Sequence, residues 1–315
     1  MAGYFLEPPD EGPAIQRDQP MRITLSGDLG SGKSTVGRRL AERLKLPHHS
    51  AGSLFREIGQ ISNLDALQTN LAAEDNVAID AAVDNRTREL DRTVDSFIID
   101  SRMAWHFVTG AARVYLSASP ETAAKRIAAD TTRSSETYTS HAEALASLER
   151  RRESEIRRYK KLYSADITDA RNYDLIIITD DAEVDDIAEL IIRFAERKTQ
   201  QKYWIPKRRL VPMIDVGGAR GAMSQQGSAD SASLPVVISR NFGFFFDGAR
   251  ELAAALEHEL SLVPYRGIND TPGGEDAFKL AQRTLKSSAL QRWQNGFKVA
   301  FSFADCLPDS ASAHA

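Results

Sequence analysis

The chain has 315 residues, 42% of them hydrophobic and 27% charged, which is the composition of a globular protein with one large or two ordinary domains. A net charge of −4 argues against a dedicated nucleic-acid-binding protein. The single cysteine, Cys306, excludes an intramolecular disulfide bond and favours a reducing compartment, so we expect a cytoplasmic protein. No apolar run approaches the roughly 18 residues that a membrane-spanning helix needs, so we expect no membrane partner.

A glycine-rich turn follows the first predicted strand. Residues 1–20 are expected to form a flexible leader, the apolar run 23–26 a strand, and residues 35–45 a helix. Between this strand and helix lies Gly-Asp-Leu-Gly-Ser-Gly-Lys-Ser, at 27–34, which fits the P-loop pattern G-x-x-x-x-G-K-[ST]. The pattern predicts that the protein binds a nucleoside triphosphate.

The chemistry of a P-loop assigns a role to each part of this turn. Its glycines let backbone N–H groups point at phosphate oxygens, in front of the positive end of a helix. Lys33 would reach the β- and γ-phosphates of ATP, and Ser34 would place its hydroxyl on Mg²⁺. The residues predicted to bind ATP are Gly27, Asp28, Gly30, Ser31, Gly32, Lys33, Ser34 and Thr35.

Short apolar strands alternate with helical patterns as far as residue 198. A short strand that leads into a helix is predicted within 47–56, and helices within 57–92. The further predicted elements are strands at 97–99, 113–116 and 173–179 and helices that start at 120 or span 143–163 and 184–198. This alternation predicts an α/β fold with a parallel five-stranded sheet flanked by helices, over residues 21–200.

The composition changes after residue 200. Residues 201–233 combine prolines and basic residues with a small polar stretch, and we expect a linker there. Residues 234–308 are expected to form a small α+β module, and residues 309–315 a disordered tail. The elements expected in the module are strands at 234–238 and 297–303 and helices at 248–262 and 275–294. Such a module could bind a protein partner or form a homodimer with a second copy of the chain.

Polar residues gather where three predicted strands end, at 27–34, 50–56 and 100–102. Because parallel sheets bind ligands at the carboxyl ends of their strands, these clusters are expected to meet at one rim. A kinase for small molecules also needs cations, which neutralise the charge on the transferring phosphoryl group. The candidates are Arg56, Arg102, Arg126 and Arg133, the last two of which flank a hydroxyl-rich stretch expected to be a lid.

A charged helix supplies a second set of candidates. Arg151, Glu155 and Arg158 recur at i, i+4 and i+7, which places all three on one helix face. This face could bind phosphate groups; the alternative is a solvated face with internal ion pairs.

Paired motifs resemble those of the cytidylate kinases, which are P-loop nucleoside monophosphate kinases. Ser26–Val36, followed by Ser50-Ala51-Gly52-Ser53-Leu54-Phe55-Arg56, is similar to the opening of these enzymes. Arg151-x-x-x-Glu155-x-x-Arg158-Tyr159, with Tyr173-Asp174-Leu175 after it, is similar to their closing segment. The resemblance covers about residues 21–198 and implies the nucleoside monophosphate kinase fold with its lid.

The resemblance also implies an activity, which is ATP- and Mg²⁺-dependent phosphoryl transfer to a nucleoside monophosphate, with CMP or dCMP as the acceptor. Ser34 and Asp100 would hold the metal ion. The residues implied to be catalytic are Lys33, Arg102, Arg126, Arg133 and Arg158. Those implied to bind the acceptor are Ser50, Gly52, Arg56, Asp100, Arg102, Arg151, Glu155 and Arg158. In the family an aspartate stands at the position of Glu155, so here an extra methylene shifts the carboxylate that contacts the acceptor's sugar.

Two other functions fit the same residues. The first is a P-loop kinase for another small phosphate or hydroxyl acceptor in a specialised pathway, where Asp100 would be the base that activates a hydroxyl. The second is a nucleotide-dependent switch whose C-terminal module binds a partner. The absence of an Asn-Lys-x-Asp motif argues against a GTPase.

Overall fold

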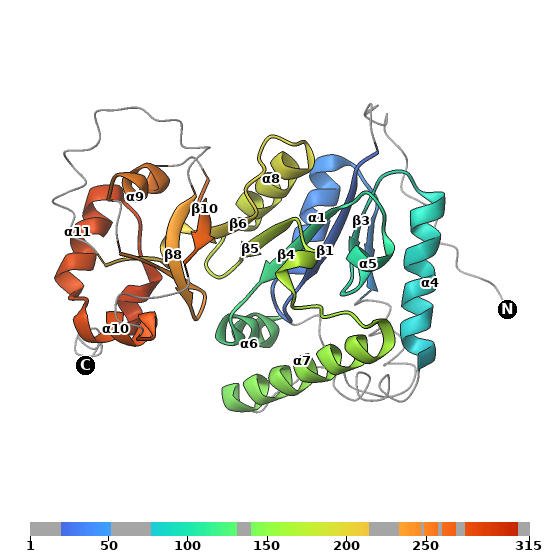
Figure 1. Cartoon of the computed structure of the whole chain (residues 1–315), viewed down its shortest axis with the longest axis horizontal. Coiled ribbons are helices and arrows are strands. Elements are labelled where there is room, and N and C mark those ends of the chain that lie inside the picture. Colours follow the sequence, from blue (N-terminus) through green and yellow to red (C-terminus); the bar gives the residue numbers. More distant parts are fainter. Residues whose placement is uncertain are drawn as a thin grey trace.

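The computed structural model describes residues 20–51, 77–130, 140–213, 233–246, 249–257, 260–268 and 275–307. Within these ranges the chain forms an α/β fold with one mixed sheet, which continues into a C-terminal extension, the described residues from 203 to 307 (Figure 1). The predicted tail, nearly all of the predicted leader and most of the predicted lid stretch lie outside the described residues.

Five parallel strands form the first half of the sheet, as the alternating pattern predicted. In spatial order they are β2 (His48–Ser50), β3 (Phe97–Asp100), β1 (Arg22–Gly27), β4 (Ala112–Ser117) and β5 (Leu175–Ile178). The register pairs Leu25 with Asp100 and Gly27 with Leu116. The glycine-rich turn therefore leaves the sheet beside the end of β3, where Asp100 lies.

Helices cover both faces of this parallel part. Side chains alternate between faces along a strand, so in β3 Ile98 packs toward one pair of helices and Phe97 and Ile99 toward the other. The first pair is α1 (Lys33–Leu44) and α8 (Val184–Ala195), and the second is α4 (Val77–Thr93) and α5 (Ala104–Phe107). A short 3-10 helix (η1, Ala170–Asn172) precedes β5.

Two further helices lie at the end of the strands where the P-loop turns (Figure 1). Helix α6 (Pro120–Ala129) begins at Ser119, whose side chain caps the backbone N–H of Thr122. Helix α7 (His141–Tyr163) begins at Ser140, which caps Glu143 in the same way. The two helices pack against each other, so the long charged helix is fixed over the rim rather than projecting into solvent.

The sheet does not stop at β5, so the predicted five-stranded sheet is too small. Strand β6 (Tyr203–Pro206) pairs parallel with β5, and β10 (Leu262–Gly267) pairs antiparallel with β6. The described sheet then runs through β8 (Leu234–Ser239), β9 (Phe242–Phe245) and β7 (Leu210–Pro212), which gives ten strands. Residues 203–206 and 210–212, expected to begin a linker, are therefore strands; residues 214–232 lie outside the described ranges.

Strand β6 joins the two halves because its neighbouring side chains enter different cores. Trp204 is buried with the residues between the parallel strands and α1 and α8, whereas Ile205 is buried in the extension. Alternation with a period of two puts these residues on opposite faces of the strand. The extension thus contributes Trp204 to the apolar core of the first half and is not a separate appendage.

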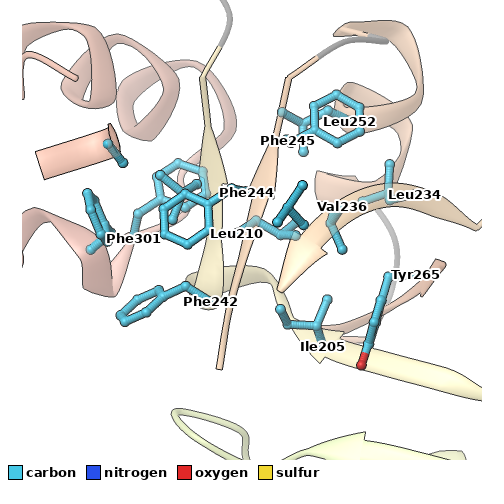
Figure 2. Packing of buried hydrophobic residues seen from close by; sticks show 14 of the residues in the cluster. Ile205, Leu210, Leu234, Val236, Phe242, Phe244, Phe245, Leu252, Tyr265 and Phe301 are labelled. Atoms are coloured by element: carbon cyan, nitrogen blue, oxygen red, sulfur yellow. The ribbon is translucent and has the colours of Figure 1, made fainter. Parts of the chain in front are cut away.

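The extension has its own aromatic core (Figure 2). Phe242, Phe244 and Phe245 of β9 are buried there, among residues of the surrounding strands and helices. The packed helices are α9 (Ala249–Leu256), α10 (Ala277–Thr284) and α11 (Ser287–Phe297), with 3-10 helices at Lys207–Arg209 (η2) and Ser302–Cys306 (η4).

Three predictions for the extension were wrong in detail. The predicted helix 248–262 ends at Leu256, and residues from 262 onward form β10. The predicted helix 275–294 is two helices, because Leu285 and Lys286 have extended backbones. The predicted strand 297–303 is replaced by the end of α11 and by η4, whose buried Phe303 packs into the aromatic core without strand pairing.

Within the described residues, no helix is long and apolar enough to cross a membrane.

Replacing Trp204 with alanine tests whether β6 belongs to the first core. Since Trp204 is only 3% exposed, Trp204→Ala should lower the free energy of unfolding by about 3–5 kcal/mol in urea titration. Lys202→Ala, which removes a partly exposed side chain next to the same strand, should change it by less than about 0.5 kcal/mol. Equal unfolding midpoints for the wild type and Trp204→Ala would contradict this packing.

Candidate active site

The P-loop is held against β4 and α6 by close backbone packing. A Cβ at Gly27 would lie 2.1 Å from the carbonyl oxygen of Leu116, and a Cβ at Gly30 would lie 2.7 Å from Cα of Ala123. Both glycines have positive φ, 145° and 68°, so any larger residue would displace the turn. A Cβ at Gly32 would meet no described atom within 4 Å, so the loop is open on that side.

The open side of the loop faces the start of α1 and the Lys33 ammonium. No described side chain caps this helix, so the N–H groups of its first turn remain oriented toward the loop. Lys33 Nζ donates to the carbonyl oxygens of Asp28, at 2.6 Å, and Gly27, at 3.2 Å. Burial, with the nearby charge of Arg102 acting in the same direction, lowers the pKa of Lys33 to about 7. The loop thus combines aligned amides with a desolvated cation, which fits a polyphosphate.

A hydroxyl and a carboxylate meet beside the loop. Ser34 Oγ donates to Asp100 Oδ2 at 2.5 Å, and Ser50 Oγ donates to the same oxygen at 3.3 Å. Among the described residues no cluster of three or more His, Cys, Asp or Glu side chains could hold a metal alone. An oxygen pair of this kind fits Mg²⁺, which commonly takes one or two protein oxygens and completes its shell with phosphates and water.

Arg102 connects the loop to α7. Its Nη1 donates to the carbonyl oxygen of Gly27 at 2.7 Å, and its Nε donates to Glu155 Oε2 at 2.7 Å. Arg151 Nε lies 3.4 Å from the other oxygen of Glu155. Although burial opposes ionisation, the charges of Arg102 and Arg151 lower the pKa of Glu155 to about 2. The structure therefore brings Arg151 and Glu155 together, as the helix spacing predicted, and adds Arg102 from the end of β3 to the same carboxylate.

The alternative of a solvated helix face is wrong for this part of α7. Glu155 is 5% exposed and Arg158 is 4% exposed. Arg158 lies with its guanidinium 5.0 Å from the centre of the Tyr159 ring and donates to the Tyr159 hydroxyl. Arg158 is thus buried beside the same rim.

Asp28 turns away from the open side of the loop. Its carboxylate accepts from the Tyr115 hydroxyl at 2.8 Å and from the Ala118 backbone N–H at 3.0 Å, and it pairs with Arg152 at 3.2 Å. Sequence reasoning missed Tyr115 and Arg152, because neither belongs to a motif and both approach Asp28 from distant parts of the chain. Asp28 acts in the structure as an anchor of the loop.

Arg126 also reaches the loop, from α6. It donates to the carbonyl oxygens of Gly30, at 3.3 Å, and Thr179, at 2.6 Å. Ser31 is buried in the turn, and Thr35 is exposed in the first turn of α1. Gly52, Arg56 and Arg133, which were also predicted to belong to the site, lie outside the described residues.

Comparison with known proteins identifies the family. The profile of the Cytidylate kinase-like family matches residues 22–181, which are 160 of the 315 residues. The chain belongs to the cytidylate kinase-like family. The match runs from β1 to just beyond β5 and stops before β6, so the extension lies outside the part that defines the family.

The chain is also similar to individual proteins. The chain is similar to the cytidylate kinase of Sulfurisphaera tokodaii, with 36% identity over 173 residues, 54% of this chain and 93% of that protein. It is also similar to the S-adenosylmethionine-dependent nucleotide dehydratase of Lacinutrix mariniflava, with 32% identity over 56% of this chain and 36% of that protein. Among solved structures, shikimate kinase from Acinetobacter baumannii gives a TM-score of 0.39 and 18% identity, over 57% of this chain and 95% of that chain.

The low pKa of Glu155 predicts an acid-dependent contribution to stability. A carboxyl whose pKa is lower in the folded protein stabilises the fold above its unfolded value of 4.5, and this contribution is lost as the pH falls toward the folded value of about 2. Glu155→Gln should therefore lower the free energy of unfolding by about 3 kcal/mol at pH 7. The gap between the unfolding free energies of the variant and the wild type should shrink as the pH falls from 4.5 to 2.

Urea titrations over this pH range measure the difference. Glu153→Gln is the matched control, because Glu153 lies on the same helix with 60% of its side chain exposed. A difference between the wild type and Glu155→Gln that stays constant with pH would show that Glu155 is not held as a carboxylate by the arginines.

Proposed function

We propose that the protein transfers the γ-phosphoryl group of ATP to a nucleoside monophosphate, with CMP or dCMP as the acceptor. The observation that carries this proposal is the shared carbonyl oxygen of Gly27, which accepts from both Lys33 and Arg102. The P-loop thus meets, at one carbonyl oxygen, an arginine that is itself paired with the Glu155 carboxylate of α7. The similarity to cytidylate kinases supports the choice of acceptor.

The donor phosphates would bind on the open side of the loop. The first amides of α1 and Lys33 would face their oxygens, and the nearby negative charge would raise the pKa of Lys33 from about 7, so that the bound lysine is fully charged. Its present bonds to the carbonyl oxygens of Gly27 and Asp28 would then compete with bonds to phosphate. Lys33 would therefore neutralise negative charge on the donor phosphates from its present position beside the loop.

Ser34 and Asp100 would hold Mg²⁺. When bound, Mg²⁺ neutralises phosphate charge and orients the phosphate groups for in-line transfer. Asp100 is 4% exposed and its Oδ2 already accepts from two hydroxyls, which keeps the carboxylate fixed at the end of β3.

The acceptor phosphate would approach Arg102, Arg151 and Arg158. Because Glu155 binds Arg102 and Arg151, it would fix the directions in which their remaining N–H groups point. A phosphate monoester is largely ionised at pH 7, so no general base is needed and the protein's task is to align two anions and offset their repulsion. We propose Gly52 and Arg56 as further ligands of the acceptor, and Arg133 as a further cation that acts on the donor.

A different small acceptor is the second candidate. It is favoured by Glu155, which stands where cytidylate kinases have an aspartate and so places its carboxylate differently beside the sugar. A hydroxyl acceptor would need a base, and Asp100 is poorly suited because two hydroxyls already donate to it. For the nucleotide-dependent switch, residues 203–206 and 210–212 of the predicted linker are strands, and residues 214–232 lie outside the described ranges.

A panel of nucleoside monophosphates and deoxynucleoside monophosphates tests the acceptor, with ADP formation from ATP and Mg²⁺ followed in a coupled assay on the full chain. CMP or dCMP should give the highest kcat/KM. Failure of both, with turnover of another nucleotide or of shikimate-like hydroxyl compounds, would overturn the acceptor assignment.

Lys33→Ala is the control for the P-loop in the same assay. It should lower kcat by about 100-fold or more while the far-UV circular dichroism stays unchanged, since one cation facing the transferring group is lost. Lys125→Ala, which removes an exposed lysine of α6, should keep wild-type turnover. Wild-type turnover in Lys33→Ala would refute the role of Lys33.

A further inference from the structure

The extension contacts the family-defining part of the chain at a buried carboxylate, that of Asp180. Asp180 follows β5 and is fully buried, with 0% exposure. From the extension, Asn241 Nδ2 donates to its Oδ2 at 2.9 Å, and Arg209 Nη2 lies 3.5 Å from its Oδ1. Arg209 also donates to the neighbouring Asp181. A buried carboxylate is costly unless it has hydrogen-bond donors or a cation beside it, and the extension provides one donor, Asn241, and one cation, Arg209.

The other donors to Asp180 come from the start of α6. The backbone N–H of Ser119 donates at 3.1 Å, the Ser119 hydroxyl donates to the same carboxylate, and Thr122 Oγ1 donates at 2.7 Å. Ser119 is also the N-cap of α6. Asp180 therefore ties the first turn of this helix to the extension.

Helix α6 in turn contacts the P-loop at two points one turn further along. Ala123 packs so closely on Gly30 that a Cβ there would lie 2.7 Å from its Cα. Arg126 donates to the carbonyl oxygens of Gly30 and of Thr179, the residue just before Asp180. A displacement of α6 would thus also displace the P-loop, because close-packed contacts transmit displacement.

The packing of the extension fixes both partners of Asp180, Asn241 and Arg209. Arg240 and Asn241 form the two-residue turn between β8 and β9, with φ of 50° and 60°, the conformation typical of a tight hairpin. Arg209 is held with its guanidinium 4.4 Å from the centre of the Phe242 ring. Phe242 is itself buried in the aromatic core of the extension. The hairpin turn therefore holds Asn241 in position, and the contact with the Phe242 ring holds Arg209 in position.

We propose that Asn241 and Arg209 are positioning residues of the donor-nucleotide site, which they support by holding α6 against the P-loop through Asp180. The identity of the ligand as a nucleoside triphosphate or diphosphate rests on the proposed function. The support is reciprocal, because a ligand that favours the seated position of α6 must also favour the docked extension. The extension, which lies outside the family match, thereby becomes part of the nucleotide-binding machinery.

Asn241→Gly tests this proposal on the full chain. Glycine keeps the positive-φ backbone of the turn and removes only the amide that donates to Asp180. Binding of Mg-ADP, measured by isothermal titration calorimetry, should weaken by about three- to tenfold. The KM for ATP should rise by a similar factor, with little change in the KM for the acceptor.

Arg240→Gly is the matched control, since Arg240 lies in the same turn but packs over the Phe278 ring rather than contacting Asp180. It should bind Mg-ADP like the wild type. Arg209→Ala compared with Arg208→Ala gives a second pair, because Arg208 is exposed on the same 3-10 helix. Urea titration without nucleotide shows whether each variant is folded at the assay temperature.

The outcomes separate the two proposals. Weaker nucleotide binding in Asn241→Gly and Arg209→Ala, with both controls unchanged, supports the positioning role. Unchanged binding in both test variants overturns it, and so does an equal loss in test and control variants, which would reflect general destabilisation. Absence of Mg-ADP binding to the wild type would overturn the proposed function itself, and this inference with it.

Discussion

The carbonyl oxygen of Gly27 accepts hydrogen bonds from Lys33 and Arg102, and the rest of the site depends on this shared acceptor. Two cations placed so close together repel each other, which contributes to the low pKa of Lys33. Glu155 and Asp100 offset part of this repulsion from the two sides of the loop. A bound polyphosphate would offset the remaining repulsion between the two cations, so the positive charge at this rim would favour binding of an anion.

The P-loop is consequently fixed from several directions. Arg102, which follows β3 and is bound by Glu155 of α7, donates to the loop, and Arg152 of α7 pairs with Asp28. Helix α6 holds the loop through Ala123 and Arg126. A Cβ at Gly32 would meet no described atom within 4 Å, and this is the side of the loop where we propose that the phosphates bind. Such preorganisation matters in phosphoryl transfer, because the protein contributes alignment and charge rather than covalent chemistry.

Local patterns account for what could be predicted from the sequence. The P-loop, the five strands before residue 200 and the i, i+4, i+7 face of α7 all depend on residues near one another in the chain, and each was found where expected. The junction at Asp180 could not be predicted in this way, because its partners Ser119, Arg209 and Asn241 come from separate segments and carry no motif. Strand β6 is short, and its pairing with β10 depends on a segment far along the chain, so its residues resembled a linker.

The mixed sheet changes how the C-terminal extension is understood. Trp204 contributes to the core of the first half, and Asp180 joins the extension to α6, so the family-defining part is not an isolated unit in this protein. The extension contacts α6, which packs on the side of the P-loop that we assign to the donor, whereas α7 contributes charged side chains on the side that we assign to the acceptor.

Phosphorus-31 NMR of the full chain with ATP, Mg²⁺ and CMP tests the central claim most directly, because it reports both products of the transfer. The proposed arrangement of a donor loop and an acceptor group around Gly27 predicts that ADP and CDP signals grow together in equal amounts, with little inorganic phosphate. Release of inorganic phosphate at a rate independent of CMP, or an unchanged ATP spectrum with every nucleoside monophosphate tried, would contradict a site built for two nucleotides.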